Sequence, residues 1–426
     1  MIRHPIRSMG MLALGAAAIA LATIPLTARA QDKTGGLVEK ASPVEGWDAF
    51  VESLRGLPER MLAKLPEDMR NDPQVRAEVG RVALEALASS SIEALGADPN
   101  APTFLPAIGQ VLDVGQPNAD TVYKVAAVDP AQSYRISGKA GTIPIAVIAQ
   151  AVPGSNVRPQ LDLASLHTDA RGHFSVLAAA ERPAGYEGDF WKLEPGTRRL
   201  MMRFMSADWT HDQDPVVTIE RIGAPMGRAR PSAQDLTARL AGLSRAIGYM
   251  APMFVGRVSE LAREGYVNRF KPMVPPEGAL ASQFYYDGVF DLQDDEALIV
   301  ETGLPETCRY RSLILTNELY ETIDWTNNHS SLNGAQAAPD PDGKLRIVVS
   351  AQDPGVKNWL DTAGYPRGII QGRWTGCSSQ PVPTIAKVKL ADVRKALPAD
   401  VARVTPEQRD AIVRERNRAY QQRSLW

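Results

Sequence analysis

The chain has 426 residues, of which 44% are hydrophobic and 23% are charged, and its formal net charge is −2. This composition is typical of a chain that folds around an apolar core, and it excludes a largely disordered protein. The chain lacks the basic excess that nucleic-acid binding requires, so we expect no nucleic-acid partner. The length predicts two domains, or one large β unit with additional segments.

The first thirty residues have the pattern of a secretory signal peptide. Arg3 and Arg7 precede an apolar run over 11–26, and 28-ARA-30 supplies the small residues typical of a cleavage site. We therefore expect cleavage near Ala30 and a mature protein in the periplasm. The alternative is an uncleaved anchor, although the run is short for a membrane span. Later segments are too polar to cross a bilayer, so no membrane span is expected after signal removal.

Residues 31–105 are predicted to form an N-terminal helical segment. The stretch 42-SPVE-45 has the sequence of a capping box with proline at the first helical position. A second helix is expected from Asp72-Pro73 to about Ala97, because apolar residues recur there every three or four positions.

From about residue 106 the apolar pattern changes to short runs rich in branched and aromatic residues, which Asp-Pro, Pro-Gly and glycine turns separate. Residues 106–225 are therefore predicted to be a first β-sandwich unit. Its expected strands cover 121–128, 133–137, 142–152, 173–177, 199–206 and 216–222.

Residues 226–278 are expected to be a helical insertion, capped by Ser232 and continuing to about Glu264, followed by a proline-rich linker. A second β-sandwich unit is predicted for 279–392, with strands at 283–292, 297–301, 310–315, 345–350, 368–374 and 385–390. Residues 393–426 are predicted to end in a helix that Thr405 caps. Its arginines favour a solvated face over a nucleic-acid site: Arg414, Arg416, Arg418 and Arg423.

These segments predict a mainly β protein of the α+β class, with two β-sandwich or jelly-roll-like units, N-terminal helices and a C-terminal helix. One large sandwich with helical insertions is the alternative. Cys308 and Cys377 could form a disulfide in an oxidising compartment, or they could be two buried thiols, and the sequence leaves both open. Two cysteines without a CxxC motif do not make a zinc site.

Four clusters of polar and aromatic residues could bind a ligand: 117-PNADTVY-123, 207-ADWTHDQDP-215, 324-DWTNNHSSLNG-334 and 353-DPGVKNWLDTAGYPRG-368, the last running on to Trp374. Each could also be a set of polar turns and packed tryptophans. Because aromatic faces and amide or carboxylate edges suit polyhydroxylated rings, we predict substrate contacts from these clusters. The candidates are Trp325, Asn327, Asn328, Asn358, Trp359, Asp361, Tyr365, Trp374, Asn118, Asp120, Tyr123, Asp208 and His211.

His329 is the residue of the third cluster that could transfer a proton near neutral pH. Asp324 or Asp361 could orient it, and Arg373 could hold a carboxylate, a sulfate or a developing negative charge. The sequence has no GxSxG, HExxH, Walker or post-strand GxGxxG motif, so we expect no nucleotide cofactor. A divalent metal on the carboxylates around His211 is an alternative, although their spacing matches no dedicated metal loop.

Several of these stretches resemble the bacterial family called domain of unknown function 1214. The resembling segments are 208-DWTHDQDPVVTIERI-222, 296-EALIVET-302, 321-ETIDWTNNHSSLNGAQA-337 and 353-DPGVKNWLDTAGYPRGIIQGRW-374. Segments 118–141 and 189–204 extend the resemblance to about residues 70–420. It implies an exported, β-rich fold with sandwich domains, and it brings neither a reaction nor a catalytic residue. Thr210 stands where such sequences commonly have Tyr or Asn.

Two functions are compatible with these observations. The first is an exported enzyme, a lyase or hydrolase, that acts by acid–base chemistry on a saccharide-like or small cyclic substrate. The second is a non-catalytic periplasmic protein that binds a ligand or serves as a scaffold. If the clusters converge on one deep pocket that His329 faces, the enzyme is favoured, and scattered clusters would favour a structural role. The oligomeric state is not predicted.

Overall fold

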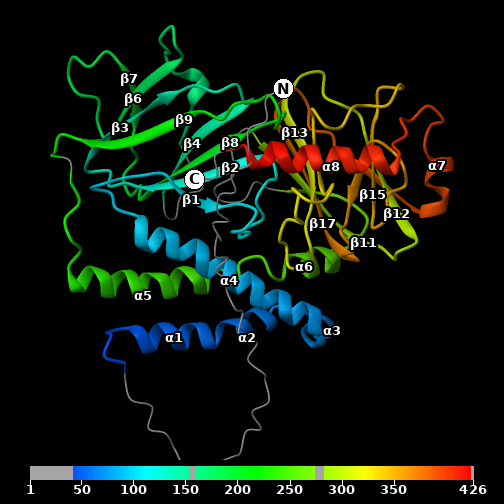
Figure 1. Cartoon of the computed structure of the whole chain (residues 1–426), viewed down its shortest axis with the longest axis horizontal. Helices are drawn as coiled ribbons and strands as arrows, with labels where there is room; N and C mark the ends of the chain where they lie inside the picture. The colour runs from blue at the N-terminus through cyan, green and yellow to red at the C-terminus, as the bar shows by residue number, and fades with distance from the viewer. Residues whose placement is uncertain (1–41, 153–158, 226, 274–282, 424–426) are drawn as a thin grey trace, which may run out of the picture. The chain divides into compact units, whose positions relative to one another are not determined.

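The structure is a computed structural model that describes residues 42–152, 159–225, 227–273 and 283–423. The expected signal peptide and the end of the expected proline-rich linker lie outside the described residues. Within them, two sandwich-like β units follow one another along the chain, and helices precede, separate and follow them (Figure 1).

The first β unit consists of two sheets that face each other. Sheet 1 has the order β1 (Leu105–Ile108), β2 (Thr121–Ala127), β8 (Arg199–Met205), β4 (Ile145–Ala151) and β5 (Gln160–Asp162). Sheet 2 has the order β7 (Asp189–Lys192), β6 (His173–Ala179), β3 (Ser133–Lys139) and β9 (Val216–Ile222). Alternate residues of these strands point inward, so Val122, Ile148 and Leu200 of sheet 1 share a core with Ile136 and Val176 of sheet 2.

The second β unit repeats this architecture. Sheet 3 has the order β10 (Lys271–Met273), β11 (Gln283–Asp291), β17 (Arg367–Cys377), β13 (Cys308–Leu315) and β14 (Ser331–Asn333). Sheet 4 has the order β16 (Trp359–Asp361), β15 (Leu345–Ser350), β12 (Glu296–Thr302) and β18 (Thr384–Lys389). The mixed α+β class with two sandwich-like units, predicted from the sequence, is therefore confirmed.

The two cysteines form a disulfide that links β13 to β17, where Cys308 and Cys377 lie opposite each other in the strand register. Of the two alternatives that the sequence left open, the bridge is the one that the structure contains. It closes a separation of 69 residues within the second β unit.

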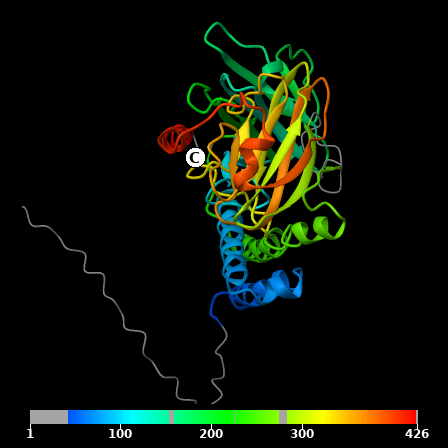
Figure 2. The ribbon, with the colours of Figure 1, turned by 90° about the vertical axis from the view of Figure 1, so that its right-hand side faces the viewer.

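A helical layer packs beneath the sheets in both views (Figures 1 and 2). It contains α1 (Trp47–Arg55), α2 (Leu57–Leu62), α3 (Glu67–Asn71), α4 (Pro73–Gly96), α5 (Ala233–Met250) and α6 (Arg257–Arg263). The Asp72 side chain caps α4, and Ser232 forms a full capping box on α5, as the sequence predicts. Buried residues of α1, α2, α4 and α5 form one apolar cluster.

Two helix boundaries differ from the prediction. The Ser42 capping box is wrong: α1 begins at Trp47 after Gly46, and Ser42 Oγ instead accepts a hydrogen bond from the Val44 nitrogen. The helix after Ser232 ends at Met250, because Pro252 has no amide hydrogen with which to continue the bonding ladder. The region expected to continue it to Glu264 is the separate helix α6.

Sheets 1 and 3 pack against each other through the faces that point away from their own cores. Ile145, Val147 and Met205 of sheet 1 surround Tyr310 of sheet 3. We call this layer between the two outer faces the seam. The chain ends with α7 (Val393–Ala396), which packs on sheet 4, and with α8 (Pro406–Gln421), which contacts both β units.

Candidate ligand-binding site

The stretch 324–334 is a loop that leads into β14, and Asp324 shapes its first turn. The Asp324 carboxylate accepts hydrogen bonds from the backbone nitrogens of Thr326 at 2.9 Å and Asn327 at 3.1 Å, and from the Asn327 amide at 2.7 Å. Gln110 donates a further bond to it at 2.8 Å. These contacts are those of an Asx turn. The prediction that Asp324 orients His329 is therefore wrong, because the Asp324 carboxylate accepts from its own turn and from Gln110.

His329 is buried, with 4% of its surface exposed, and both ring nitrogens have partners. Nδ1 donates to the Trp359 carbonyl, which can only accept, so Nδ1 holds the proton of the neutral ring. Nε2 then presents its lone pair to Arg409 Nη1 at 3.4 Å. Burial lowers the pKa of His329 well below its usual value, and the charges of Arg416 and Arg409 lower it further. This environment holds His329 neutral and directs its lone pair at a protein donor.

The buried neutral histidine predicts an acid-sensitive fold. The unfolded chain protonates His329 below about pH 6.5 while the folded protein does not, so this group's contribution to stability falls as pH falls through and below 6.5. Between pH 8 and pH 5 we expect the wild type to lose about 2 kcal/mol more than His329→Gln, at about 1.4 kcal/mol per pH unit. Urea unfolding of both proteins across this range measures it. Parallel stability curves would show that His329 titrates normally in the fold.

A cleft of about 390 Å³ lies between α8 and the loops of the second β unit, and we call it the α8 cleft. The third and fourth sequence clusters meet in it. The predicted residues among its lining are Asn327, Asn328, His329, Trp359 and Asp361. The other wall comes from the chain leading into α8 and from its first turns, through Val404, Pro406, Arg409, Asp410 and Val413.

Arg409 lines the α8 cleft and is fully engaged by protein groups. Its Nε donates to Asp353 at 2.8 Å and its Nη2 to the Val356 carbonyl at 2.5 Å. The guanidinium lies 5.0 Å from the centroid of the Trp359 ring, which also stacks on His329. Trp359 is therefore buried between protein groups, and its ring packs on Arg409 and His329 instead of presenting an open aromatic surface to a ligand.

Carboxylates dominate the polar rim of the α8 cleft. Asp353 and Asp410 are exposed and Asp361 is half-buried. Asp353 pairs with Arg409 and Asp410 pairs with Arg414 on the outer side of α8, at 2.8 and 2.7 Å. Burial raises the pKa of Asp361, and the nearby charge of Asp353 raises it further. The rim therefore offers acceptors to a ligand that can donate hydrogen bonds.

The first and second clusters meet elsewhere, around the fully buried Asp120. Its carboxylate accepts hydrogen bonds from the Trp209 indole at 2.8 Å, the Asn333 amide at 2.8 Å and the Tyr310 hydroxyl at 2.6 Å. Asn118 donates to Tyr310 at 2.8 Å. We call this set the Asp120 node. It joins the first β unit, through Asn118, Asp120 and Trp209, to strands β13 and β14 of the second.

The prediction that the C-terminal arginines form a solvated face is wrong for half of them. Arg414 and Arg418 are exposed, whereas Arg416 and Arg423 are buried, as is Arg409. Arg409 and Arg416 are seven residues apart, close to two helical turns, so one face of α8 carries both toward the sheets. Arg423 follows just after the end of α8 and is buried as well.

Each buried arginine docks α8 on a different part of the fold. Arg416 donates to the Trp325 carbonyl and to Ser331 Oγ at 2.9 and 2.7 Å. Its guanidinium also lies 4.7 Å from the Trp209 ring of the first β unit. Arg423 makes a two-pronged ion pair with Asp214 and donates to the Asp120 carbonyl at 2.7 Å. Through these contacts α8 connects both β units and forms the wall of the cleft.

The remaining predicted residues are dispersed. Trp325 is buried against Tyr420, and Asn358 donates to the Ala338 and Arg346 carbonyls. Asp208 and His211 pair at 2.9 Å in an exposed turn. Arg373 and Tyr123 lie on the outer faces of sheets 3 and 1, so Arg373 is not brought together with His329. Tyr365 lies beside the charged cluster of α4.

That charged cluster was missed by the sequence analysis. Arg81 on α4 lies 2.5 Å from Glu321 and 3.5 Å from Glu85. Burial and the hydrogen bond to Glu321 raise the pKa of Glu85 to about 9, and burial raises the pKa of Asp113 as well. Arg81 and Glu85 are four residues apart on α4, a spacing typical of an exposed salt bridge. The contact of Arg81 with Glu321, far away in the sequence, is what sets this pair apart from an ordinary surface pair.

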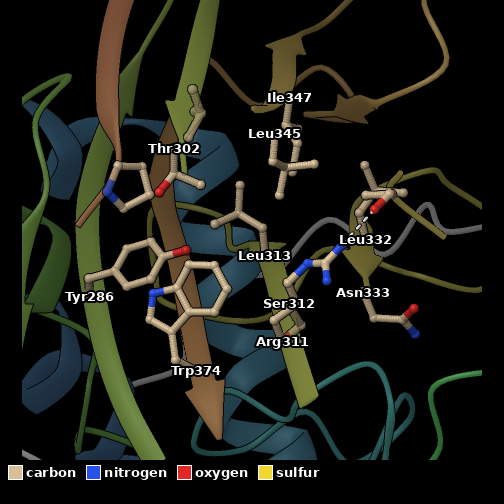
Figure 3. A pocket seen from close by; sticks show the side chains of 13 residues that line it. Tyr286, Thr302, Arg311, Ser312, Leu313, Leu332, Asn333, Leu345, Ile347 and Trp374 are labelled. Atoms are coloured by element: carbon tan, nitrogen blue, oxygen red, sulfur yellow. Dashed lines mark hydrogen bonds between the residues drawn. The ribbon is translucent and has the colours of Figure 1, made fainter. Parts of the chain in front are cut away.

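A second, smaller hollow lies inside the second β unit. Figure 3 shows Tyr286 and Trp374 on one side of it and Leu345 and Ile347 on the other. Its volume of about 20 Å³ has room for about one water molecule. Trp374 is 1% exposed and donates its indole hydrogen to the Pro381 carbonyl, so it is a core residue and not a ligand platform.

Over the described ranges, no group of three or more His, Cys, Asp and Glu side chains is arranged to hold a metal ion. The carboxylates around His211 are bonded to protein donors: Asp212 accepts from Ser206 and two backbone nitrogens, and Asp214 pairs with Arg423. In the same part of the chain, the helices are all too short or too polar to cross a membrane.

The chain is similar in structure to an uncharacterised protein from Burkholderia cenocepacia, with 26% sequence identity and a TM-score of 0.74 over 82% of this chain and 97% of that one. A protein from Vibrio parahaemolyticus is more distant, with 14% identity and a TM-score of 0.43 over 73% of this chain and 99% of that one. No protein-family model matches the sequence, and neither does any curated protein. Membership of the family that the sequence resembles therefore stays a prediction.

Proposed function

We propose that this protein is an exported, periplasmic binding protein that takes a small neutral or cationic molecule, rich in hydroxyl or amino groups, into the α8 cleft. The observation that carries this proposal is the convergence of the third and fourth sequence clusters on one cleft of about 390 Å³. That volume is within the range of small-molecule sites, roughly 300–1,000 Å³. The amides of Asn327 and Asn328 and the carboxylate of Asp361 are polar groups that could orient a ligand there.

The charge of the cleft supports the choice of ligand class. Asp353 pairs with Arg409 and Asp410 with Arg414, so Asp361 is the lining carboxylate whose charge is not balanced by an ion pair. The Arg409 guanidinium is already bonded to Asp353 and to the Val356 carbonyl. An anionic ligand would meet like charge and no unused donor of Arg409. Hydroxyl and ammonium groups would instead donate to the carboxylates, which favours sugars, amino sugars and polyamines over sugar acids.

The proposal predicts that Asp361→Ala weakens ligand binding. A ligand that binds the folded state raises the melting temperature, so a thermal-shift panel of neutral sugars, amino sugars, polyamines and sugar acids identifies the class. We expect hits among the first three groups and a loss of at least about tenfold in affinity in Asp361→Ala, which is about 1.4 kcal/mol. Asp294→Ala removes an exposed carboxylate of the same β unit and serves as the control.

Two results would overturn the proposal. One is preferential binding of sugar acids, which would contradict the charge argument. The other is a set of hits whose affinities are the same in Asp361→Ala and the wild type, which would place the ligand outside the α8 cleft.

A second candidate is the acid–base enzyme of lyase or hydrolase type, with different catalytic groups from those predicted from the sequence. Burial and the neighbouring charge of Asp353 raise the pKa of Asp361, and a carboxyl with a raised pKa can serve as a general acid or base. Product analysis after incubation with each hit tests this candidate. Turnover that is lost in Asp361→Asn while binding remains would support the enzyme, and unchanged ligand would support the binding protein.

A further inference from the structure

Arg373, predicted from the sequence to hold a negative charge, lies in the seam and away from the α8 cleft. It is 4% exposed, and its Nη1 atom is buried without a hydrogen-bond partner. A buried guanidinium nitrogen without an acceptor costs free energy, because it has lost its hydrogen bond to water and gained none in the fold. A position of this kind requires an explanation.

The residues around Arg373 follow from the register of sheet 3. Tyr285 on β11 and Ser312 on β13 lie opposite Arg373 on its two sides, so the three form one row across the outer face. The guanidinium is 5.6 Å from the Tyr285 ring centroid. Ser312 also buries its hydroxyl oxygen without a hydrogen-bond partner. Two donors with unused capacity thus lie side by side.

The facing sheet brings a second guanidinium to this row. Arg203 lies opposite Tyr123 on the outer face of sheet 1. Burial raises the pKa of Tyr285, and the positive charges of Arg373 and Arg203 both oppose that rise, so both lie near the same hydroxyl. Tyr123, Arg203 and Tyr285 are each only partly buried, which gives the row contact with solvent along the seam.

One buried carboxylate, Asp287, lies on the same outer face of sheet 3. Its Oδ2 accepts from Tyr320 and lies 3.9 Å from Arg257, its Oδ1 has no hydrogen-bond partner, and the charge of Arg373 favours its ionised form. Asp287 therefore balances part of the charge of Arg373 without bonding to its Nη1 atom, which can still donate to an acceptor from solution.

We propose that the seam binds a small oxyanion between Arg373 and Arg203, with Arg373 Nη1 and the Ser312 hydroxyl as its buried donors. A phosphate or sulfate group, or the carboxylate of a small organic acid, has the acceptors that a guanidinium and a hydroxyl recognise. The site is distinct from the α8 cleft, whose charge disfavours anions, and it does not rest on the function proposed for that cleft. Because the anion would contact sheets 1 and 3 together, its binding would stabilise the packing of the two β units.

The test compares the full mature chain with three variants in inorganic phosphate, sulfate and acetate at constant ionic strength set with sodium chloride. We expect saturating phosphate or sulfate to raise the melting temperature of the wild type by about 2–3 °C. Arg373→Met should lose this response, and Arg373→Lys, which keeps the charge but not the planar fork, should keep part of it. Arg367→Met is the matched control, because Arg367 is a half-buried arginine of the same strand with its own partner Asp291.

Calorimetric titration completes the test, with one anion per chain expected for the wild type and for Arg367→Met. A larger response to acetate than to the tetrahedral anions would identify the site as a carboxylate site of the same chemistry. Equal responses of the wild type and Arg373→Met would overturn the proposal, since a general salt effect on apolar burial would then explain them. The absence of stoichiometric binding by the wild type would overturn it as well.

Discussion

Replacement of Asp120 by alanine is expected to lower the free energy of unfolding by about 3–5 kcal/mol, the usual cost of removing one side of a buried charged network. The Trp209 indole, the Asn333 amide and the Tyr310 hydroxyl would all lose their acceptor. None of them can turn to water, because Asp120 is 1% exposed and its donors are buried around it. The loss should be seen in urea unfolding followed by tryptophan fluorescence.

Two further variants separate the charge of Asp120 from its hydrogen bonds. Asp120→Asn keeps one acceptor oxygen and the side-chain shape, so it should lose less stability than Asp120→Ala. Asp294→Ala removes an exposed aspartate of the second β unit and should change stability by less than about 0.5 kcal/mol. A similar small change for Asp120→Ala would mean that the node does not hold the two β units together.

The second large effect is expected at the end of α8. Arg423→Ala removes a two-pronged ion pair with Asp214 and the bonds to the Asp120 and Phe204 carbonyls. Asp214 would remain as a largely buried carboxylate without its partner, so a loss of about 3–5 kcal/mol is expected. Arg418→Ala on the exposed face of the same helix is the matched control and should cost less than about 0.5 kcal/mol.

Hydrogen exchange distinguishes a local from a global effect of Arg423→Ala. If α8 is held mainly by its buried arginines Arg409 and Arg416 and by Arg423 just after its end, amides of its last turns should exchange faster than those of sheets 1 and 3. Equal losses of stability in Arg423→Ala and Arg418→Ala would contradict the role assigned to the buried face. Because α8 forms one wall of the α8 cleft, a loosened α8 in Arg423→Ala should also weaken ligand binding in the cleft.

The candidate site was only partly predictable, and His329 shows why. Histidine is rare in this chain, and His329 has polar neighbours in 324–334, a stretch that does line a cleft. The sequence could not show that the Trp359 carbonyl, thirty residues away, accepts the Nδ1 hydrogen bond, or that Arg409, eighty residues away, faces the Nε2 lone pair. Those contacts make the ring neutral and occupied, whereas a residue pattern alone predicted a catalytic base.

The arginines of α8 show a second limit. Their seven-residue spacing and the Thr405 capping box together predict a helix with one basic face, and the capping box is present. Whether that face points to solvent or to protein depends on what covers it. Here Asp353, Asp214 and several backbone carbonyls from both β units provide acceptors for Arg409, Arg416 and Arg423. A periodicity argument cannot supply these acceptors.

The sequence by itself determined the local elements of this protein: β9 at 216–222 and β15 at 345–350 match their predicted ranges, and the caps at Ser232 and Thr405 are present. Period-two and helical patterns are local signals, so they are readable without the fold. Only the tertiary structure decided that Asp120 meets Tyr310 and Asn333, and that Arg373 lies in the seam and not beside His329. The physical reason is that buried hydrogen bonds depend on sheet register and on packing between segments hundreds of residues apart, which no local pattern contains.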